Sequence, residues 1–209
     1  MRSKVSEATV QRLFIYLRTL EKFQKNLTLS SQKFSKLVGI NECSIRRDLA
    51  CFGKFGIPGC GYKVEELRRE IIHILGLNRE WKLALVGVGR LGRALLVYPG
   101  FNREKFRIRL AFDNDPQKIG KILEGILVQD VEKVPYLLPK FRIKIGIIAT
   151  PTEAAQRVAD KLIEGRVRGI LNFTSKHLIV PDNIKVKNVD LSTSVEMLSF
   201  FLTHRINES

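Results

Sequence analysis

The sequence predicts an α/β protein in which a small winged helix-turn-helix domain precedes a doubly wound parallel sheet and a C-terminal helix. Apolar residues in the first eighty positions recur every three or four residues, as in amphipathic helices. A glycine-rich turn follows an apolar strand segment near residue 87, and strand-like and helix-like segments alternate from there onward. We therefore expect domains at residues 1–79 and 80–191 and a terminal helix within residues 192–209.

The chain is strongly basic, because its 209 residues contain 36 Lys and Arg against 21 Asp and Glu, a formal charge of +15. Such a balance favours a polyanionic partner, either nucleic acid or an acidic membrane surface. A merely soluble basic protein would have the same composition. Residues 1–79 contain 15 of the cations and only 7 of the acids, so positive charge is densest in the first domain.

The sequence contains no signal for a membrane span, for export or for a metal site. No apolar run approaches roughly 18 residues, and the first residues, MRSKVSEATVQ, lack the apolar stretch of a signal peptide. Cys43, Cys51 and Cys60 do not have metal-ligand spacing, so reduced thiols are the expected state. We therefore expect a cytoplasmic protein with no membrane contact and no metal.

Three helices account for the apolar pattern of the first fifty residues. The expected apolar stripe of the first helix comprises Val10, Leu13, Phe14, Leu17 and Leu20. The next two helices are short, with Ser30 or Ser31 and then Asn41 as N-caps and Gly39 as the C-cap between them. Their expected inward residues are Phe34, Leu37, Val38, Ile45, Leu49 and Phe52.

Two short helices joined by a glycine-containing turn are typical of a helix-turn-helix, whose second helix enters the major groove of DNA with its N-terminal end first. Ser44, Arg46, Arg47 and Asp48 are predicted to lie near the exposed N-terminal half of this recognition helix. Arginines there can reach guanine edges or phosphates. The alternative is a surface helical hairpin whose arginines are only solvated.

The segment GKFGIPGCGYKV, residues 53–64, contains four glycines in nine positions, which suits a tight hairpin better than a helix. A hairpin after a helix-turn-helix is a wing, a second contact to the DNA backbone or minor groove. Lys54 and Lys63 flank it with positive charge. The DNA-binding residues expected from the helix and wing are Ser44, Arg46, Arg47, Lys54, Gly59, Tyr62 and Lys63.

The stretch ALVGVGRLGRALL contains a Rossmann-like dinucleotide motif, with glycines at 87, 89 and 92 after a strand at residues 82–86. The first glycine permits the tight turn, the second lets the backbone approach a pyrophosphate, and the third lets the helix pack close to the strand. A second strand, RIRLAFD, ends in Asp113, 21 residues beyond Gly92. A carboxylate there binds the ribose hydroxyls and repels a 2′-phosphate, so NAD(H) is favoured over NADP(H). Asp115 could share this role or cap a helix after Pro116.

Later segments continue the alternation, with strands predicted at residues 144–150, 168–174 and 185–191 and a helix from Pro151. Ligands in doubly wound sheets bind beyond the carboxyl ends of the strands. The candidates for the nicotinamide pocket are Thr150, Pro151, Asn172, Phe173 and Thr174. The full expected cofactor set is Gly87, Val88, Gly89, Arg90, Leu91, Gly92, Asp113, Asn114, Thr150, Pro151, Asn172 and Phe173.

The distribution of residues favours sensing over catalysis. A dehydrogenase needs a proton donor or acceptor beside the hydride acceptor, and His177 is the only histidine near a predicted strand end. Little chain remains for a substrate domain, so no catalytic residue is assigned. The alternatives are a small NAD-dependent oxidoreductase and a regulator of another nucleotide-like ligand such as coenzyme A. The apolar tail SVEMLSFFLTHRI packs either on its own domain or on a second subunit.

In order along the chain, SIRRDL, FGKFGIPGCGY, VGVGRLGRALLVYPGF, AFDNDPQKIG, IATPTEAAQ, GILNF and NVDL make the sequence resemble the Rex family of redox-sensing transcriptional repressors. The resemblance implies a homodimer that binds palindromic DNA operators when NADH is scarce and releases them when NADH binds. It also implies a C-terminal helix exchanged between subunits.

The resemblance carries several residue roles to this chain. It places Arg46 and Arg47 on the recognition helix, and it implies a redox-dependent switch formed by Arg18, Tyr98 and Asp190. The family's wing usually reads Arg-Gly-x-Gly-Tyr, and here Pro58 replaces that arginine. An arginine suited to a narrow minor groove is thus missing, which implies an altered operator preference or affinity.

Overall fold

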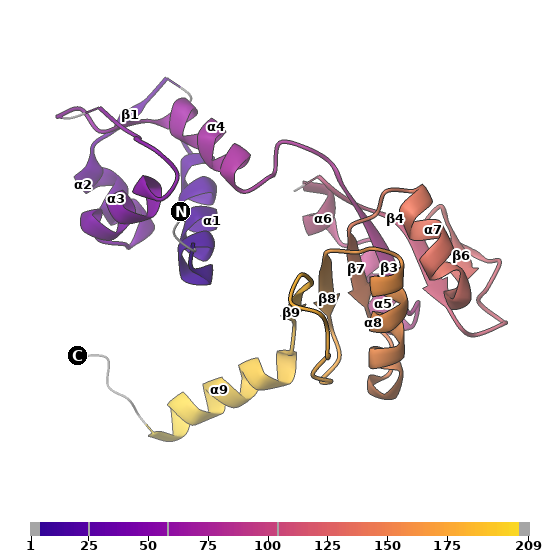
Figure 1. Cartoon of the computed structure of the whole chain (residues 1–209). Coiled ribbons are helices and arrows are strands. Elements are labelled where there is room, and N and C mark those ends of the chain that lie inside the picture. Colours follow the sequence, from indigo (N-terminus) through magenta and orange to yellow (C-terminus); the bar gives the residue numbers. More distant parts are fainter. Residues whose placement is uncertain (1–4, 25, 58, 104, 205–209) are drawn as a thin grey trace. The chain divides into compact units, whose positions relative to one another are not determined.

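The computed structural model describes residues 5–24, 26–57, 59–103 and 105–204, so the wing residue Pro58 lies outside the described residues. The chain divides into two compact units, Met1–Arg79 and Glu80–Ser209. Unit 1 contains helices and one short two-stranded sheet, and unit 2 contains a seven-stranded sheet with its helices (Figure 1).

Unit 1 is built around a helix-turn-helix. Its elements are α1 (Glu7–Leu20), β1 (Thr28–Leu29), α2 (Ser31–Val38), α3 (Glu42–Ala50), β2 (Tyr62–Lys63) and α4 (Val64–Ile74). The predicted caps are confirmed: Ser30 and Asn41 accept hydrogen bonds from backbone N–H groups three residues on, and Gly39 is left-handed at φ 68°. The strand β1, which the sequence pattern did not indicate, pairs antiparallel with β2.

The core of unit 1 differs from the predicted pattern at several residues. Phe14 and Leu37, expected inside, are exposed, and Tyr16, which was not in the stripe, is fully buried. Asp48, expected on the exposed half of the recognition helix, is only 2 % exposed. The reason is helical spacing, because Asp48 falls one turn after the buried Ile45 and beside Leu49.

Unit 2 is a doubly wound sheet in the strand order β5-β6-β4-β3-β7-β8-β9, parallel except for β5. Its strands are β3 (Trp81–Val86), β4 (Phe106–Asp113), β5 (Ile122–Leu123), β6 (Ile126–Asp130), β7 (Ile145–Ile148), β8 (Gly169–Asn172) and β9 (Lys185–Asn188). Its helices are α5 (Arg90–Leu96), α6 (Pro99–Arg103), η1 (Val131–Lys133), α7 (Val134–Lys140), η2 (Thr152–Ala154), α8 (Ala155–Glu164) and α9 (Leu191–His204). The expected helix after Pro116 is absent from the described residues: a turn leads instead to the β5–β6 hairpin.

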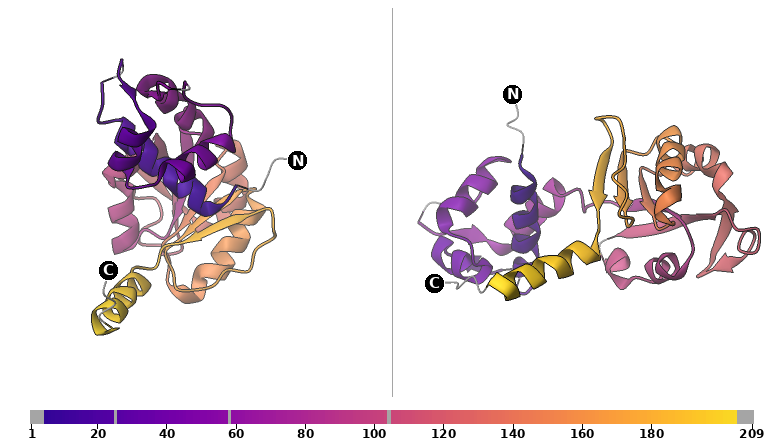
Figure 2. Two further views of the ribbon diagram at one scale, coloured as in Figure 1. Left: turned by 90° about the vertical axis from the view of Figure 1, so that its left-hand side faces the viewer. Right: turned by 90° about the horizontal axis from the view of Figure 1, so that it is seen from below.

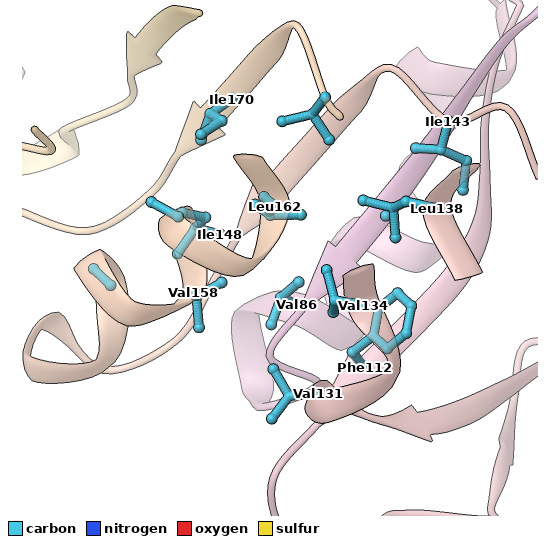
Figure 3. Packing of buried hydrophobic residues seen from close by; sticks show 14 of the residues in the cluster. Val86, Phe112, Val131, Val134, Leu138, Ile143, Ile148, Val158, Leu162 and Ile170 are labelled. Carbon is cyan, nitrogen blue, oxygen red and sulfur yellow. The ribbon is translucent and has the colours of Figure 1, made fainter. Parts of the chain in front are cut away.

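Helices cover both faces of this sheet (Figures 1 and 2). On one face α7 and α8 bury a large apolar cluster that includes Val86, Phe112, Leu138, Ile148 and Leu162 (Figure 3). On the other face a second cluster centres on Leu85 and Ile147, with Leu95 from α5 and Phe101 from α6. Burial on both faces explains why the central strands are continuously apolar.

The last helix of unit 2, α9, buries none of its residues. Its exposed apolar side chains are Leu191, Val195, Met197, Leu198, Phe200, Phe201 and Leu202. The alternative in which the tail packs on its own domain is therefore not what the described residues show. No helix in the described ranges is long and apolar enough to cross a membrane.

Candidate functional site

The glycine turn at residues 87–92 lies at the carboxyl end of β3, the central strand of the sheet. Gly87 has φ 96°, and a Cβ atom there would collide with the carbonyl oxygen of Ala149. A Cβ at Gly92 would collide with the carbonyl oxygen of Gly87, so this glycine allows α5 to pack against the turn. Apart from the local backbone around Gly89, no atom of the described residues lies within 4 Å of a Cβ built there. That open side is where the backbone can approach a ligand.

A cavity of about 290 Å³ opens beside this turn. Among its lining residues are Gly87, Gly89, Asp113, Asn114, Lys118, Thr150, Pro151 and Arg157. The volume lies at the low end of the range for ligand pockets. Its position beyond the carboxyl ends of the strands is that of a nucleotide site in doubly wound sheets.

Asp113 links the second strand to the glycine turn. One carboxylate oxygen accepts a hydrogen bond from the Val88 N–H at 2.9 Å, and the other accepts one from the Asp115 N–H at 3.0 Å. Lys118 Nζ lies 3.3 Å from the first of these oxygens. Burial raises the pKa of Asp113, but these hydrogen bonds and the lysine charge outweigh burial, so the pKa lies below its ordinary value. The carboxylate is therefore ionised at neutral pH and suited to accept hydrogen bonds from ribose hydroxyls.

Thr150 lines the same cavity and has a buried hydroxyl oxygen. Its Oγ1 is buried without a hydrogen-bond partner, and buried hydroxyls are nearly always hydrogen-bonded. The open side of Gly89 and the ionised carboxylate of Asp113, which line the same cavity, fit a polar ligand such as a dinucleotide. The residues present therefore fit NAD(H).

Some of the other expected cofactor residues lie at the glycine turn, and others are packed within the structure of unit 2. Arg90 and Leu91 begin α5 and are exposed. Asn172 and Phe173 do not line the cavity: the Asn172 amide is fully buried and donates to the carbonyl oxygen of Lys176 at 2.9 Å, and Phe173 packs on the α5 side of the sheet. Asp115 accepts a hydrogen bond from the Gln117 N–H at 2.9 Å and shapes the turn.

A second candidate site is the groove between the recognition helix α3 and the wing in unit 1. Arg46, Gly59 and Tyr62 line a concavity of about 360 Å³, and Arg47 and Lys54 are exposed nearby in the sequence. A Cβ on Gly61 would collide with the carbonyl oxygen of Leu29, so the wing closes tightly over β1 only with glycine there. Two exposed arginines on α3 give this unit the chemistry for phosphate or guanine contact.

Three of the expected DNA-binding residues have additional structural roles. Tyr62 is only 4 % exposed and packs edge-on against Phe34, so it fixes the position of the wing. Ser44 is half-buried, and its N–H donates to the Asn41 side chain. Lys63 pairs with Glu66 at 2.8 Å, which offsets part of its charge.

Sequence reasoning missed the anchor of the recognition helix, which is the buried carboxylate of Asp48. Its two oxygens accept hydrogen bonds from Arg12 Nη2 and Nε, each at 2.6 Å, and Tyr16 Oη donates at 2.7 Å. Burial raises the pKa of Asp48, but hydrogen bonds from Arg12 and Tyr16 lower it below its usual value. The coincidence of an acid on α3 with an arginine and a tyrosine on α1 was the available signal.

The three expected switch residues lie in separate segments. Arg18 on α1 and Tyr98 before α6 are both exposed. Asp190 caps α9, because its carboxylate accepts hydrogen bonds from the Ser192 and Thr193 N–H groups at 2.9 and 3.3 Å. These hydrogen bonds lower the pKa of Asp190.

The three cysteines, Cys43, Cys51 and Cys60, are free thiols at the surface of unit 1. Within the described ranges, no group of three or more His, Cys, Asp or Glu residues could hold a metal ion.

Comparison with known proteins matches both units. A family model described as a putative DNA-binding protein N-terminus matches residues 4–50, and one described as a CoA binding domain matches residues 78–176. The redox-sensing transcriptional repressor Rex of Pelotomaculum thermopropionicum is 44% identical over 208 residues, covering 99% of this chain and 98% of the relative. The repressor of the same name from Thermus thermophilus is 44% identical over 94% of this chain and 93% of its own.

Solved structures agree with these sequence relatives. The structure of the repressor RSP in complex with NAD+ and operator DNA has a TM-score of 0.92 and 36% identity, covering 97% of this chain and 94% of RSP. RSP in complex with NADH has a TM-score of 0.84 and 35% identity, with 97% and 96% coverage. The chain therefore belongs to the Rex family of redox-sensing transcriptional repressors.

Proposed function

We propose that this protein is a DNA-binding transcriptional repressor that senses the ratio of NADH to NAD+. It binds a palindromic operator when NADH is scarce and releases the operator when NADH binds. The observation that carries the proposal is the ionised Asp113 bonded to the glycine turn, in the same chain as a recognition helix with exposed arginines. The names and bound ligands of its relatives support the proposal, and a DNA target implies a cytoplasmic location.

The homodimer is part of the proposal. Helix α9 presents seven large apolar side chains and buries none of them, and surface of this kind is typical of a protein–protein interface. A helix-turn-helix also reads paired half-sites, which requires two copies. We therefore assign α9 to the contact between subunits, with exchange of the helix as the expected arrangement.

Discrimination between the two redox states follows from charge. NAD+ carries one positive charge on the nicotinamide ring that NADH lacks, and burying an unpaired charge is costly. The apolar side chain of Pro151, which lines the cavity, would favour the neutral ring. If one arrangement of the two DNA-binding units provides that environment better than the other, NADH shifts the population toward it. Recognition helices must lie about 34–36 Å apart to enter successive major grooves, so a modest rotation abolishes operator binding.

The decisive experiment is operator binding titrated with NADH at fixed NAD+. We expect the apparent affinity for operator DNA to fall as NADH rises and to recover when NAD+ is added in excess. Equal operator binding with and without saturating NADH would reject the proposed function.

Two other functions are tested alongside it. The match to a CoA binding domain supports coenzyme A as a competing ligand, and direct competition among NADH, NADPH and coenzyme A separates the possibilities. A small NAD-dependent oxidoreductase would oxidise NADH with a simple carbonyl substrate, which a screen of such compounds would reveal. We expect no turnover and a strong preference for NADH.

A further inference from the structure

The amino-terminal edge of the unit 2 sheet, opposite the nucleotide cavity, carries a row of cations on four neighbouring strands. Lys82 on β3 is in register with Arg107 on β4. Lys144 and Arg168 each stand one residue before the paired positions Ile145 and Gly169 of β7 and β8, so they lie at the same level of the sheet. Strands are spaced about 4.8 Å apart, so the row is roughly 14 Å long. We call these four residues the basic edge.

The loops that lead into the same strand ends add three cations in the left-handed backbone conformation, which costs a non-glycine residue free energy. Only four non-glycine residues in the described ranges have positive φ, and three of them are Lys105, Arg142 and Arg166, at φ 58°, 55° and 62°. They lie just before β4, shortly before β7 and before β8. Glycine or asparagine relieves strain in this conformation. A helix end favours a cation nearby, but it does not explain a cation at the left-handed residue itself in three separate loops.

Three of the four cations of the basic edge have no ion-pair partner among the described residues. Lys82, Lys144 and Arg168 are exposed, and in the part of the chain that the structure describes no carboxylate lies within ion-pair distance of them. An acid nearby, Glu80, pairs with Arg109 at 3.0 Å. The hydrogen bond from Arg109 lowers the pKa of Glu80, and the charges of Arg107 and Lys82 lower it further. The surface therefore has a positive potential, which would attract an anionic partner.

We propose that the basic edge binds the phosphate backbone of duplex DNA flanking the operator, as a sequence-independent second contact. This inference rests on the proposed function, because it assigns a further surface to the same DNA complex. Duplex DNA is favoured over other polyanions because β3 begins at Trp81, two residues after the DNA-reading unit ends at Arg79. A row of mostly exposed cations suits a duplex, whose charges repeat about every 1.7 Å of helix axis.

The test compares two duplexes, one limited to the operator and one extended by a turn of helix on each side. The variant Lys82→Gln/Lys144→Gln/Arg168→Gln removes three cations from the edge. The matched control Lys121→Gln/Lys133→Gln/Lys176→Gln removes three exposed lysines elsewhere in unit 2. The salt dependence of binding is measured for both duplexes, since each lost phosphate contact lowers the slope of log K against log salt by about 0.9. NADH binding by each variant verifies that unit 2 is folded.

We expect the wild-type protein and the control to bind the extended duplex about tenfold more tightly than the short one, with a steeper salt slope. The edge variant should bind the two duplexes equally, with an unchanged affinity for the short one. An edge variant indistinguishable from wild type on the extended duplex overturns the proposal. The choice of DNA is overturned if the edge variant loses binding to an RNA duplex or to anionic vesicles while its binding to flanking DNA is unchanged. Failure of the wild-type protein to bind either duplex would instead reject the proposed function.

Discussion

At the residue scale, two buried carboxylates control the two sites, and they are satisfied in different ways. Asp48 is surrounded by side-chain donors of another helix, which fix the recognition helix against α1. Asp113 is held mainly by backbone N–H groups of the glycine turn and the following loop. Each is kept charged by its donors, so removing either one leaves buried donors without an acceptor.

Replacing Asp48 with alanine should lower the free energy of unfolding by about 3 kcal/mol, because the guanidinium of Arg12 and the hydroxyl of Tyr16 lose their partner. Urea denaturation at pH 7 measures this change. The folded pKa of Asp48 is lowered, so its contribution is fully present above the unfolded pKa near 4 and is lost as pH falls through the folded value. The difference between wild type and variant should therefore shrink below pH 4. Glu21→Ala, at an exposed position on the same unit, should change stability by less than about 0.5 kcal/mol.

Replacing Asp113 with asparagine tests the choice between the two coenzymes. The amide keeps an oxygen for the Val88 N–H but loses the negative charge that repels a 2′-phosphate. NADH affinity should fall about tenfold, and the preference for NADH over NADPH should fall by at least a similar factor. Titration by NADH fluorescence and competition by NADPH measure both. Asp115→Asn, which changes the neighbouring carboxylate, should leave the preference unaltered.

At the scale of the element, the notable features are a helix that covers nothing in its own unit and loops that place cations at left-handed positions. Helix α9 has the composition of a core helix and the exposure of a surface helix. The loops before β4, β7 and β8 would be more relaxed with glycine. Both features are locally unfavourable and point to partners outside the chain.

A change of Leu198 and Phe201 to glutamate should dissociate the proposed dimer, because two charges would be buried in an apolar contact. Sedimentation equilibrium measures the mass, and we expect a monomer with little operator affinity and retained NADH binding. Ser192→Glu/Thr203→Glu adds the same charge at exposed polar positions of α9 and should leave the dimer intact. A monodisperse dimer for the apolar double variant would contradict the assignment of α9.

Replacing Arg166 with glycine separates stability from charge in one loop. The left-handed conformation costs an arginine about 1–2 kcal/mol, and the added chain entropy of glycine offsets about half of this. The variant should be more stable to urea by roughly 0.5–1 kcal/mol. Arg168→Gly, at a neighbouring position outside the left-handed region, should show no such gain. A destabilised Arg166→Gly protein would show that the arginine supports the fold.

At the scale of the whole molecule, the function depends on coupling between two units, which Asp190 is proposed to mediate with Arg18 and Tyr98. Asp190 caps α9 through its side chain, and asparagine caps helices as well as aspartate does. Asp190→Asn therefore keeps the cap and removes the charge, whereas Asp190→Ala removes both.

If the charge of Asp190 is the switch, both variants should bind NADH and operator but lose most of the NADH-dependent release. If only the cap matters, Asp190→Asn should release DNA like the wild-type protein. The measurement is the ratio of operator dissociation constants with and without saturating NADH. Full coupling in both variants would reject any role for Asp190.

Local signals allowed much of the fold to be predicted from the sequence. Caps at Ser30, Gly39 and Asn41 depend on a few neighbouring residues, and the glycine turn has a fixed order, so both could be identified. The short pairing of β1 with β2 and the burial of Asp48 depend on partners more than 30 residues away. Periodicity within one segment does not contain that information. The glycine turn and Asp113 were expected at the nucleotide site, and both line the cavity. The internal hydrogen bonding of Asn172 was not expected, because an amide at a strand end can either bind a ligand or hold a loop.

The placement of every cysteine in the DNA-reading unit offers a direct view of the proposed motion. Changing Cys43 and Cys51 to serine would leave Cys60 in the wing as the single thiol of each protomer, exposed and ready for a maleimide dye. In a dimer, donor and acceptor fluorophores at this position would report the separation of the two wings. Energy transfer would then follow opening and closing in real time as reduced coenzyme is added, without any DNA in the cuvette.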